Sequence, residues 1–332
     1  MSSDPDPVRW GIVSTAAILD EMLPAFAESR AADLRAIASR DLARADAFAA
    51  ERGIPTAFGS YEALLEDDSV ECVYIALPNS LHGEWARAAI EAGKHVLCEK
   101  PLTPTAEEAS SLFELAEERG RVLMEAFMYR HHPKTRKLHE ICTGGRIGEP
   151  RVVRMKFHFK AAEPATDIRW DPELAGGALR DVGCYCVSMA TYLADAPPDH
   201  LAAIARMSDS GIDEQFSAAL GYDNDLLAVF DCGMDSPTDV GVEVLGTDGR
   251  AKVAMPWYPH LEPQSIELQQ NGGEPTEVPT PGPNAYRLEI DNVCAAARGE
   301  GPPEVSAAET VRNLTTIERL LEIARRQPTH AA

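Results

Sequence analysis

The first 126 residues alternate short apolar runs with segments of helical period, and this alternation limits the possible folds more than any other feature of the chain. The segments between the runs carry apolar residues three or four positions apart, as in 18–28, and therefore predict helices. Strands that alternate with helices are typical of a parallel sheet covered on both faces. We therefore predict a doubly wound α/β sheet whose strands lie at 8–13, 34–38, 56–58, 70–76, 96–98 and 122–126.

After Pro150 the pattern changes to period two. The run Arg151–Lys160 alternates apolar and polar residues, as a half-exposed antiparallel strand does. The segment Gly246–Gly249 contains Asp-Gly and predicts a hairpin turn. Further strands are expected at 201–207, 215–222, 226–233, 241–246, 251–255 and 265–270, with helices at 177–195, 286–298 and 307–326.

A chain of 332 residues is too long for one ordinary core. We predict an N-terminal dinucleotide-binding Rossmann domain at 1–127. An α+β domain with a large, mostly antiparallel open sheet is expected at 128–332.

Charge and cysteine usage exclude several classes of protein. The formal net charge of −22 makes nucleic acid and anionic membranes improbable partners. No apolar run approaches the roughly 20 residues that span a bilayer, and residues 1–7 are polar rather than signal-like. Seven scattered cysteines without a CxxC pair favour reduced thiols in the cytoplasm and no metal site.

The first strand, turn and helix have the order of a dinucleotide-binding unit, in which the helix N-terminus faces a pyrophosphate. The usual G-x-G-x-x-G fingerprint is not intact, because only Gly11 remains. Small residues still allow close approach of the backbone, and Ser14 or Thr15 could donate a hydrogen bond to phosphate. The candidate cofactor residues here are Gly11, Ile12, Val13, Ser14, Thr15 and Ala16.

The second strand ends in Ser39-Arg40-Asp41, which bears on the choice of cofactor. Enzymes that prefer NAD usually place an acidic residue near this point for the ribose 2′-hydroxyl. Here a hydroxyl and a guanidinium come first, and Arg40 can contact a 2′-phosphate through two hydrogen bonds. This favours NADP, with NAD as the weaker alternative. The competing interpretation is that Arg40 pairs with Asp41 or Asp46 on the surface.

The fifth strand ends abruptly in Glu99-Lys100-Pro101. Pro101 cannot continue a central strand because it lacks the N–H that the ladder needs. Lys100 is therefore expected at the carboxyl end of the strand, where open α/β sheets bind ligands. An ammonium group there could act as an acid, a hydrogen-bond donor or a proton relay. The alternative is a surface turn with a solvated lysine.

The fourth strand is likewise stopped by a proline, Pro78, and we expect the loop that follows the strand to border the nicotinamide ribose. Its candidate residues are Leu77, Pro78, Asn79 and His82. For His82, the alternative is a histidine on a helix surface.

In the second half, Asp181 and Tyr185 lie four residues apart on a predicted helix and so share a face. This face could present a carboxylate and a phenol together. The alternatives are a solvated aspartate and a core tyrosine. Trp170 lies in the preceding loop, and Trp257 follows the strand at 251–255. For Trp257, the alternative is an interface or core tryptophan.

Three segments together resemble the Gfo/Idh/MocA oxidoreductase family: Glu99–Pro101, Met124–Pro133 and Gly176–Cys186. The resemblance covers essentially the whole chain. It is closest to the branch of NADP-dependent D-xylose 1-dehydrogenases and trans-1,2-dihydrobenzene-1,2-diol dehydrogenases. Many members have a histidine where this chain has Tyr185, which points away from inositol dehydrogenases.

The resemblance implies oxidation of a sugar hydroxyl by NADP, at C1 of an aldopyranose such as D-xylose, to give the lactone. Tyr185 would be the base, Lys100 would favour its phenolate or bind the substrate oxygen, and Asp181 would orient Lys100 or a sugar hydroxyl. It also implies that Glu99, Lys100 and Arg130 border the cofactor and that Trp170 and Trp257 border the substrate.

A homodimer or homotetramer through the C-terminal sheet is expected from the same resemblance. The alternative substrates are a trans-dihydrodiol and an anhydrosugar or other ketose. The alternative from another class is a non-catalytic NAD(P)-sensing regulatory protein.

Overall fold

A computed structural model describes residues 6–164, 166–270 and 272–326. The N-terminal residues 1–5, which belong to the polar segment noted above, lie outside the described residues. The chain divides into two compact units. One contains the described residues up to Thr103 together with Glu107–Met128 and Asn284–Ala307. The other contains Pro104–Ala106, Tyr129–Pro283 and the described residues from Ala308 onward. The sequence analysis had placed 284–307 with the second domain.

The first unit contains a six-stranded sheet in which every neighbouring pair is parallel. The strand order β3-β2-β1-β4-β5-β6 confirms the predicted doubly wound sheet. Its order reverses between β1 and β4, and ligands of such sheets bind where the order reverses. The strands are β1 (Val8–Val13), β2 (Ala32–Ala38), β3 (Thr56–Phe58), β4 (Cys72–Ile75), β5 (His95–Glu99) and β6 (Leu123–Ala126).

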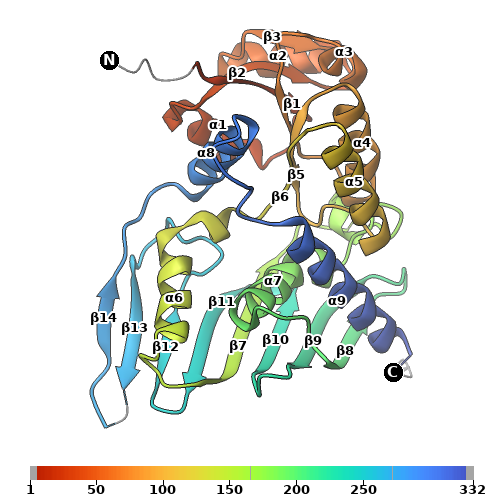
Figure 1. The fold of residues 1–332 in the computed structure, drawn as a ribbon. Coiled ribbons are helices and arrows are strands. Elements are labelled where there is room, and N and C mark those ends of the chain that lie inside the picture. Colours follow the sequence, from red (N-terminus) through yellow and green to blue (C-terminus); the bar gives the residue numbers. More distant parts are fainter. Residues whose placement is uncertain (1–5, 165, 271, 327–332) are drawn as a thin grey trace, which may run out of the picture. The chain divides into compact units, whose positions relative to one another are not determined.

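Helices cover both faces of this sheet, with α1 and α8 on one face and α4 and α5 on the other (Figure 1). The helix α8 returns from late in the sequence and packs against α1. Trp10 Nε1 donates to Cys294 Sγ at 3.3 Å, and Ser29 Oγ donates to Asp291 at 2.6 Å. The helices are α1 (Leu19–Glu28), α2 (Leu42–Arg52), α3 (Tyr61–Leu65), α4 (His82–Glu91), α5 (Ala106–Glu118) and α8 (Ala285–Ala297).

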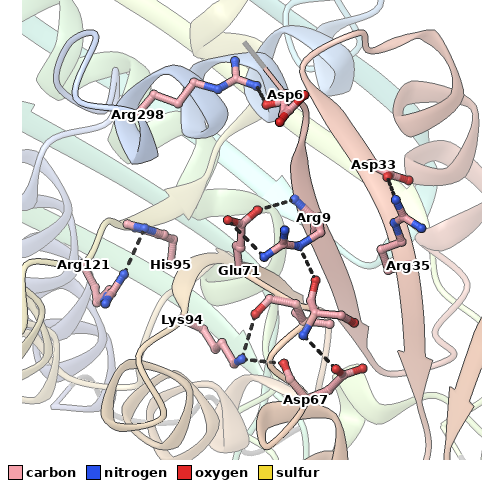
Figure 2. A network of polar contacts seen from close by, with 12 residues as sticks. Asp6, Arg9, Asp33, Arg35, Asp67, Glu71, Lys94, His95, Arg121 and Arg298 are labelled. Carbon is pink, nitrogen blue, oxygen red and sulfur yellow. Dashed lines mark hydrogen bonds and ion pairs between the residues drawn. The ribbon is translucent and has the colours of Figure 1, made fainter.

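A polar network ties together the amino ends of β1, β4 and β5 (Figure 2). Lys94 is buried, and its Nζ donates to the carbonyls of Asp67 at 2.8 Å and Val70 at 2.7 Å. Burial lowers the pKa of Lys94. The backbone N–H of Arg9 donates to Glu71 Oε2 at 3.0 Å. These contacts fix the sheet at the edge opposite the carboxyl ends of its strands.

The second unit contains an eight-stranded sheet of order β14-β13-β12-β11-β7-β10-β9-β8. All neighbours are antiparallel except β7 and β10, which are parallel. The sheet is therefore mostly antiparallel, as predicted, although β7 is antiparallel only to β11. The strands are β7 (Pro150–Lys160), β8 (His200–Met207), β9 (Asp213–Gly221), β10 (Leu227–Gly233), β11 (Asp235–Gly246), β12 (Gly249–Val253), β13 (Ser265–Gln270) and β14 (Thr276–Pro279).

The helices α6 (Pro133–Thr143), α7 (Cys184–Ala194) and α9 (Ala307–Arg325) lie on one face of this sheet (Figure 1). A π-helical turn, η4 (Leu179–Gly183), precedes α7 where a single α-helix had been predicted. The opposite face exposes apolar side chains of β8 and β10, with exposed fractions of 55% for Ile204 and 54% for Leu227. Across the described parts of the chain, no helix is long and apolar enough to cross a membrane.

Candidate active site

The predicted site residues fall into two sets, one in each compact unit, and each set has its own geometry. The first unit holds the candidates from Gly11 to Lys100, and the second holds Arg130, Trp170, Asp181, Tyr185 and Trp257.

The turn after β1 has an unusual backbone at Ser14. Its φ is +137°, a region that residues with a side chain rarely adopt. Ser14 is buried, and its N–H donates to the carbonyl of Ala38 at 3.2 Å. Strained backbone of this kind persists where the surroundings hold it and often marks a ligand site. A fixed, small-residue turn before the N-terminus of α1 fits a dinucleotide pyrophosphate.

Gly11 has a different role in this structure. A Cβ at this position would lie 2.9 Å from Leu64 Cδ2, so the glycine makes room for α3 under β1. The structure therefore supports a packing role for Gly11.

The carboxyl end of β2 carries two guanidinium groups. Arg40 interacts with the hydroxyl of Tyr61; burial raises the pKa of Tyr61, and the charges of Arg40 and Arg44 oppose that rise. Arg44 Nη2 donates to the carbonyl of Thr15 at 3.4 Å, and the N–H of Arg44 donates to Asp41, the N-cap of α2. Two cations beside Ser39 suit a phosphate. Arg44 was not among the predicted cofactor residues, although its position four residues after Arg40, in the first turn of a helix, could have indicated it.

The backbone around Lys100 is fixed by Glu99 and Tyr74. Tyr74 Oη donates to Glu99 Oε1 at 2.6 Å, and the N–H of Lys100 donates to Glu99 Oε2 at 3.3 Å. In the next loop, the N–H of Leu102 donates to Glu125 at 2.9 Å. These bonds join the ends of β4, β5 and β6, so Lys100 extends from a rigid edge.

His82 bridges two of these strand ends. Its Nδ1 lies 2.8 Å from the carbonyl of Pro101, and its Nε2 lies 2.8 Å from the carbonyl of Leu77. His82 is fully buried, and burial lowers its pKa. The alternative of a surface histidine is therefore wrong. The ring joins the loop after β4, which continues through Pro78 and Asn79, to the loop that contains Lys100.

In the second unit, Tyr185 lies in an aromatic cluster and is 7% exposed. Its ring centroid is 5.3 Å from that of Phe157, 5.7 Å from that of Trp257 and 5.9 Å from that of Tyr129. Trp257 is fully buried, and its Nε1 donates to the carbonyl of Lys156 at 3.1 Å. Trp257 is thus a core residue that packs against Tyr185.

Asp181 lies in η4 and is held by an arginine. Arg169 Nε donates to Asp181 Oδ2 at 2.8 Å, and Arg169 Nη1 donates to Asp167 at 3.1 Å. The charge of Asp181 raises the pKa of Arg169. Trp170, the next residue, is half-buried and donates from Nε1 to the carbonyl of Ala162 at 3.0 Å. The sequence analysis missed Arg169, and its position next to Trp170 was the only available signal.

Arg130 is buried within the second unit. It forms an ion pair with Glu309, and its guanidinium carbon lies 3.7 Å from the ring centroid of Tyr192. These contacts give Arg130 a structural role there, and its cofactor role remains a prediction. Among the described residues, no group of three or more His, Cys, Asp or Glu is placed to hold a metal ion.

The chain belongs to the Gfo/Idh/MocA oxidoreductase family. Residues 8–127 match the family's NAD-binding Rossmann fold, and residues 135–252 match a Gfo/Idh/MocA C-terminal domain. The matched regions contain both candidate sets except Arg130 and Trp257.

Among curated relatives, D-xylose 1-dehydrogenase (NADP(+)) 2 of Haloferax volcanii is 41% identical over 96% of this chain and 97% of its own length. The trans-1,2-dihydrobenzene-1,2-diol dehydrogenase of Mus musculus is 35% identical over 82% of this chain and 80% of its own. Among solved structures, the 3-ketoreductase KijD10 of Actinomadura kijaniata, in complex with NADP and TDP-benzene, is 31% identical. It aligns with a TM-score of 0.84 over 95% of this chain and 97% of its own.

Proposed function

We propose that this protein oxidises a sugar hydroxyl with NADP, at C1 of an aldopyranose such as D-xylose, to give the lactone. The observation that carries this proposal is the presence of Lys100, Asp181 and Tyr185 in a chain 41% identical to a D-xylose 1-dehydrogenase along almost its whole length. The rigid carboxyl edge around Lys100 and the enclosed ring of Tyr185 support it.

NADP is preferred over NAD because of the charges after β2. Ser39, Arg40 and Arg44 would hold the 2′-phosphate, and the turn Ser14–Ala16 would hold the pyrophosphate at the N-terminus of α1. When bound, the nicotinamide supplies a carbon that accepts hydride.

The protein's own residues would handle the proton and place the substrate. Tyr185 takes the proton of the substrate hydroxyl as hydride leaves the carbon that bears this hydroxyl. Lys100 stabilises the phenolate of Tyr185, or donates to the substrate oxygen. Asp181, which accepts a hydrogen bond from Arg169 Nε, orients Lys100 or a sugar hydroxyl. This scheme requires that Lys100 Nζ and Tyr185 Oη reach the same substrate carbon.

A second candidate is the oxidation of a trans-dihydrodiol, because a dihydrodiol dehydrogenase is 35% identical to this chain. The two candidates use the same hydride chemistry and differ in the ring that carries the hydroxyl. Rates of NADPH formation with D-xylose, D-glucose and a trans-dihydrodiol, measured by absorbance, distinguish them. Comparable rates with all three would contradict a sugar-specific enzyme, and NADP binding without turnover of any alcohol would favour the regulatory alternative.

We also propose a homodimer or homotetramer that joins through the exposed face of the second sheet. The apolar side chains of Ile204, Leu227 and Val229 on that face support this interface. Sedimentation of the wild type and of Leu227→Glu tests it, because a charge at the interface should produce monomers. We place the protein in the cytoplasm, a proposal supported by its seven free, buried cysteines.

A further inference from the structure

A buried carboxylate holds the start of the turn that carries Asp181. Asp213, the first residue of β9, is 3% exposed, and its Oδ2 accepts the N–H of Leu179 at 2.6 Å. Leu179 is the first residue of η4. Gly177 has a φ of +112°, and a Cβ there would overlap Oδ1 of Asp213. The glycine therefore allows the carboxylate to approach the start of the turn closely.

This contact is a helix cap supplied by a different element. The first N–H groups of a helix lack partners within the helix, and a carboxylate satisfies them and suits the positive end of the helix dipole. Ala178, which precedes η4, contributes no side-chain cap. Asp213 supplies the acceptor from β9 instead, so the position of η4 depends on this one side chain of the sheet.

Asp213 is surrounded by groups that oppose or favour its charge. Arg180 from η4 and Arg325 from α9 favour the charged form of Asp213, and so does the N–H of Leu179. The thiol of Cys232 on β10 also lies near this carboxylate. Burial outweighs these contacts and raises the pKa of Asp213 to about 6. The side chain therefore changes charge within the range of ordinary assays, and the cap is weaker when it is protonated.

We propose that Asp213 is a positioning residue, whose carboxylate sets the geometry of η4 and thereby the placement of Asp181 and Tyr185. This inference rests on the proposed function, which assigns those two residues to the reaction. Asp213 contacts the backbone of the turn and acts through it.

Two variants and one control test this inference by activity. Asp213→Asn keeps an acceptor oxygen and removes the titration, whereas Asp213→Ala removes both. Glu214→Gln changes the next carboxylate of the same strand, which points to the other face and pairs with Arg206 at 2.8 Å. All are assayed well below their melting temperatures, so that loss of fold does not contribute.

We expect the kcat of wild type to rise with increasing pH, with an inflection near pH 6. Glu214→Gln should show the same inflection. Asp213→Asn should lose this inflection and keep at every pH a kcat close to that of wild type below pH 6, because its amide is neutral like the protonated carboxyl. Asp213→Ala should be about tenfold slower than wild type at pH 8, with an unchanged KM for NADP. An unchanged pH profile in Asp213→Asn, or a wild-type kcat in Asp213→Ala, would overturn the inference.

A second measurement does not depend on turnover. In protein labelled with ¹⁵N-leucine, the Leu179 amide signal, assigned with Leu179→Met, should shift with an inflection near pH 6 in wild type and not in Asp213→Asn. A Leu179 signal that does not shift with pH would contradict the proposal that the Asp213 carboxylate holds the Leu179 amide. If wild type oxidises no sugar or diol, the proposed function fails, while this titration still decides whether Asp213 holds the turn.

Discussion

Arg169 holds Asp181 across 12 residues of chain, with a distance of 2.8 Å between Nε and Oδ2. The guanidinium also donates to Asp167, which restricts its rotation away from Asp181. Asp181 is therefore fixed before any substrate arrives.

Replacement of Arg169 should slow the reaction. In Arg169→Lys the planar fork is lost and Asp181 becomes mobile, so we expect kcat with the best sugar to fall about tenfold. Steady-state kinetics measure this change. Lys137→Met is the control, because Lys137 pairs with Glu140 on an exposed part of α6, and it should leave kcat unchanged. Equal kinetics in Arg169→Lys and wild type would show that Asp181 needs no such support.

Replacement of each of the two lysines that flank β5 should have a different effect. Lys100→Met is expected to lower kcat by about a thousandfold or more, because the proposed phenolate loses its cation, while NADP still binds. Lys94→Met should instead lower the free energy of unfolding by about 2 kcal/mol, because two buried carbonyls lose their donor. Turnover, NADP titration and urea unfolding of both variants separate the two effects. Wild-type turnover in Lys100→Met would exclude the proposed mechanism.

The arginines after β2 should determine the preference for NADP. In Arg40→Ala and Arg44→Ala, we expect KM for NADP to rise about tenfold each and KM for NAD to rise much less, because the 2′-phosphate is the part of the cofactor that these guanidinium groups would bind. Arg35→Ala, within β2 and paired with Asp33, is the control. A parallel rise in both KM values would mean that the arginines support the fold and not the phosphate.

Much of the fold followed from the sequence, because both sheets have clear periodicity. The strands 8–13, 56–58 and 265–270 were predicted with the bounds that the structure shows. The π-helical turn at Leu179–Gly183 was missed, since five residues carry no visible period. The helix Pro133–Thr143 and the strand Thr276–Pro279 were also missed, because both segments are short and rich in polar residues.

The candidate site was predictable only as residue types. Motifs indicated Lys100, Asp181 and Tyr185, but the groups that hold them come from distant parts of the sequence. Tyr74 fixes Glu99 from a neighbouring strand, and Asp213 caps η4 from β9. Burial of His82 and Trp257 likewise depends on packing that no local pattern encodes.

Stability should fall on acidification, partly because of His131. This side chain is buried without hydrogen-bond partners among the described residues, and burial lowers its pKa from 6.5 to about 3. The unfolded chain therefore binds a proton at His131 more tightly than the folded protein does. The contribution of His131 to the free energy of unfolding is fully present above pH 6.5 and is lost progressively toward pH 3. At pH 5 the loss is about 2 kcal/mol.

The variant His131→Phe should reduce this dependence. Urea unfolding at pH 7 and pH 5 should show a difference smaller by about 2 kcal/mol than in wild type. The control His200→Phe changes an exposed position on β8 and should retain the wild-type difference. An identical pH dependence in His131→Phe and wild type would assign the acid sensitivity to other groups.

The return of Asn284–Ala307 to the first unit affects how the protein is made. Trp10 and Ser29 are synthesised early, yet their partners Cys294 and Asp291 leave the ribosome only after more than 250 further residues. During translation the nascent cofactor-binding unit therefore keeps the apolar surface that α8 covers exposed until Asn284–Ala307 has been synthesised. A fragment that ends near residue 128 would keep that apolar side permanently and should depend on chaperones or aggregate.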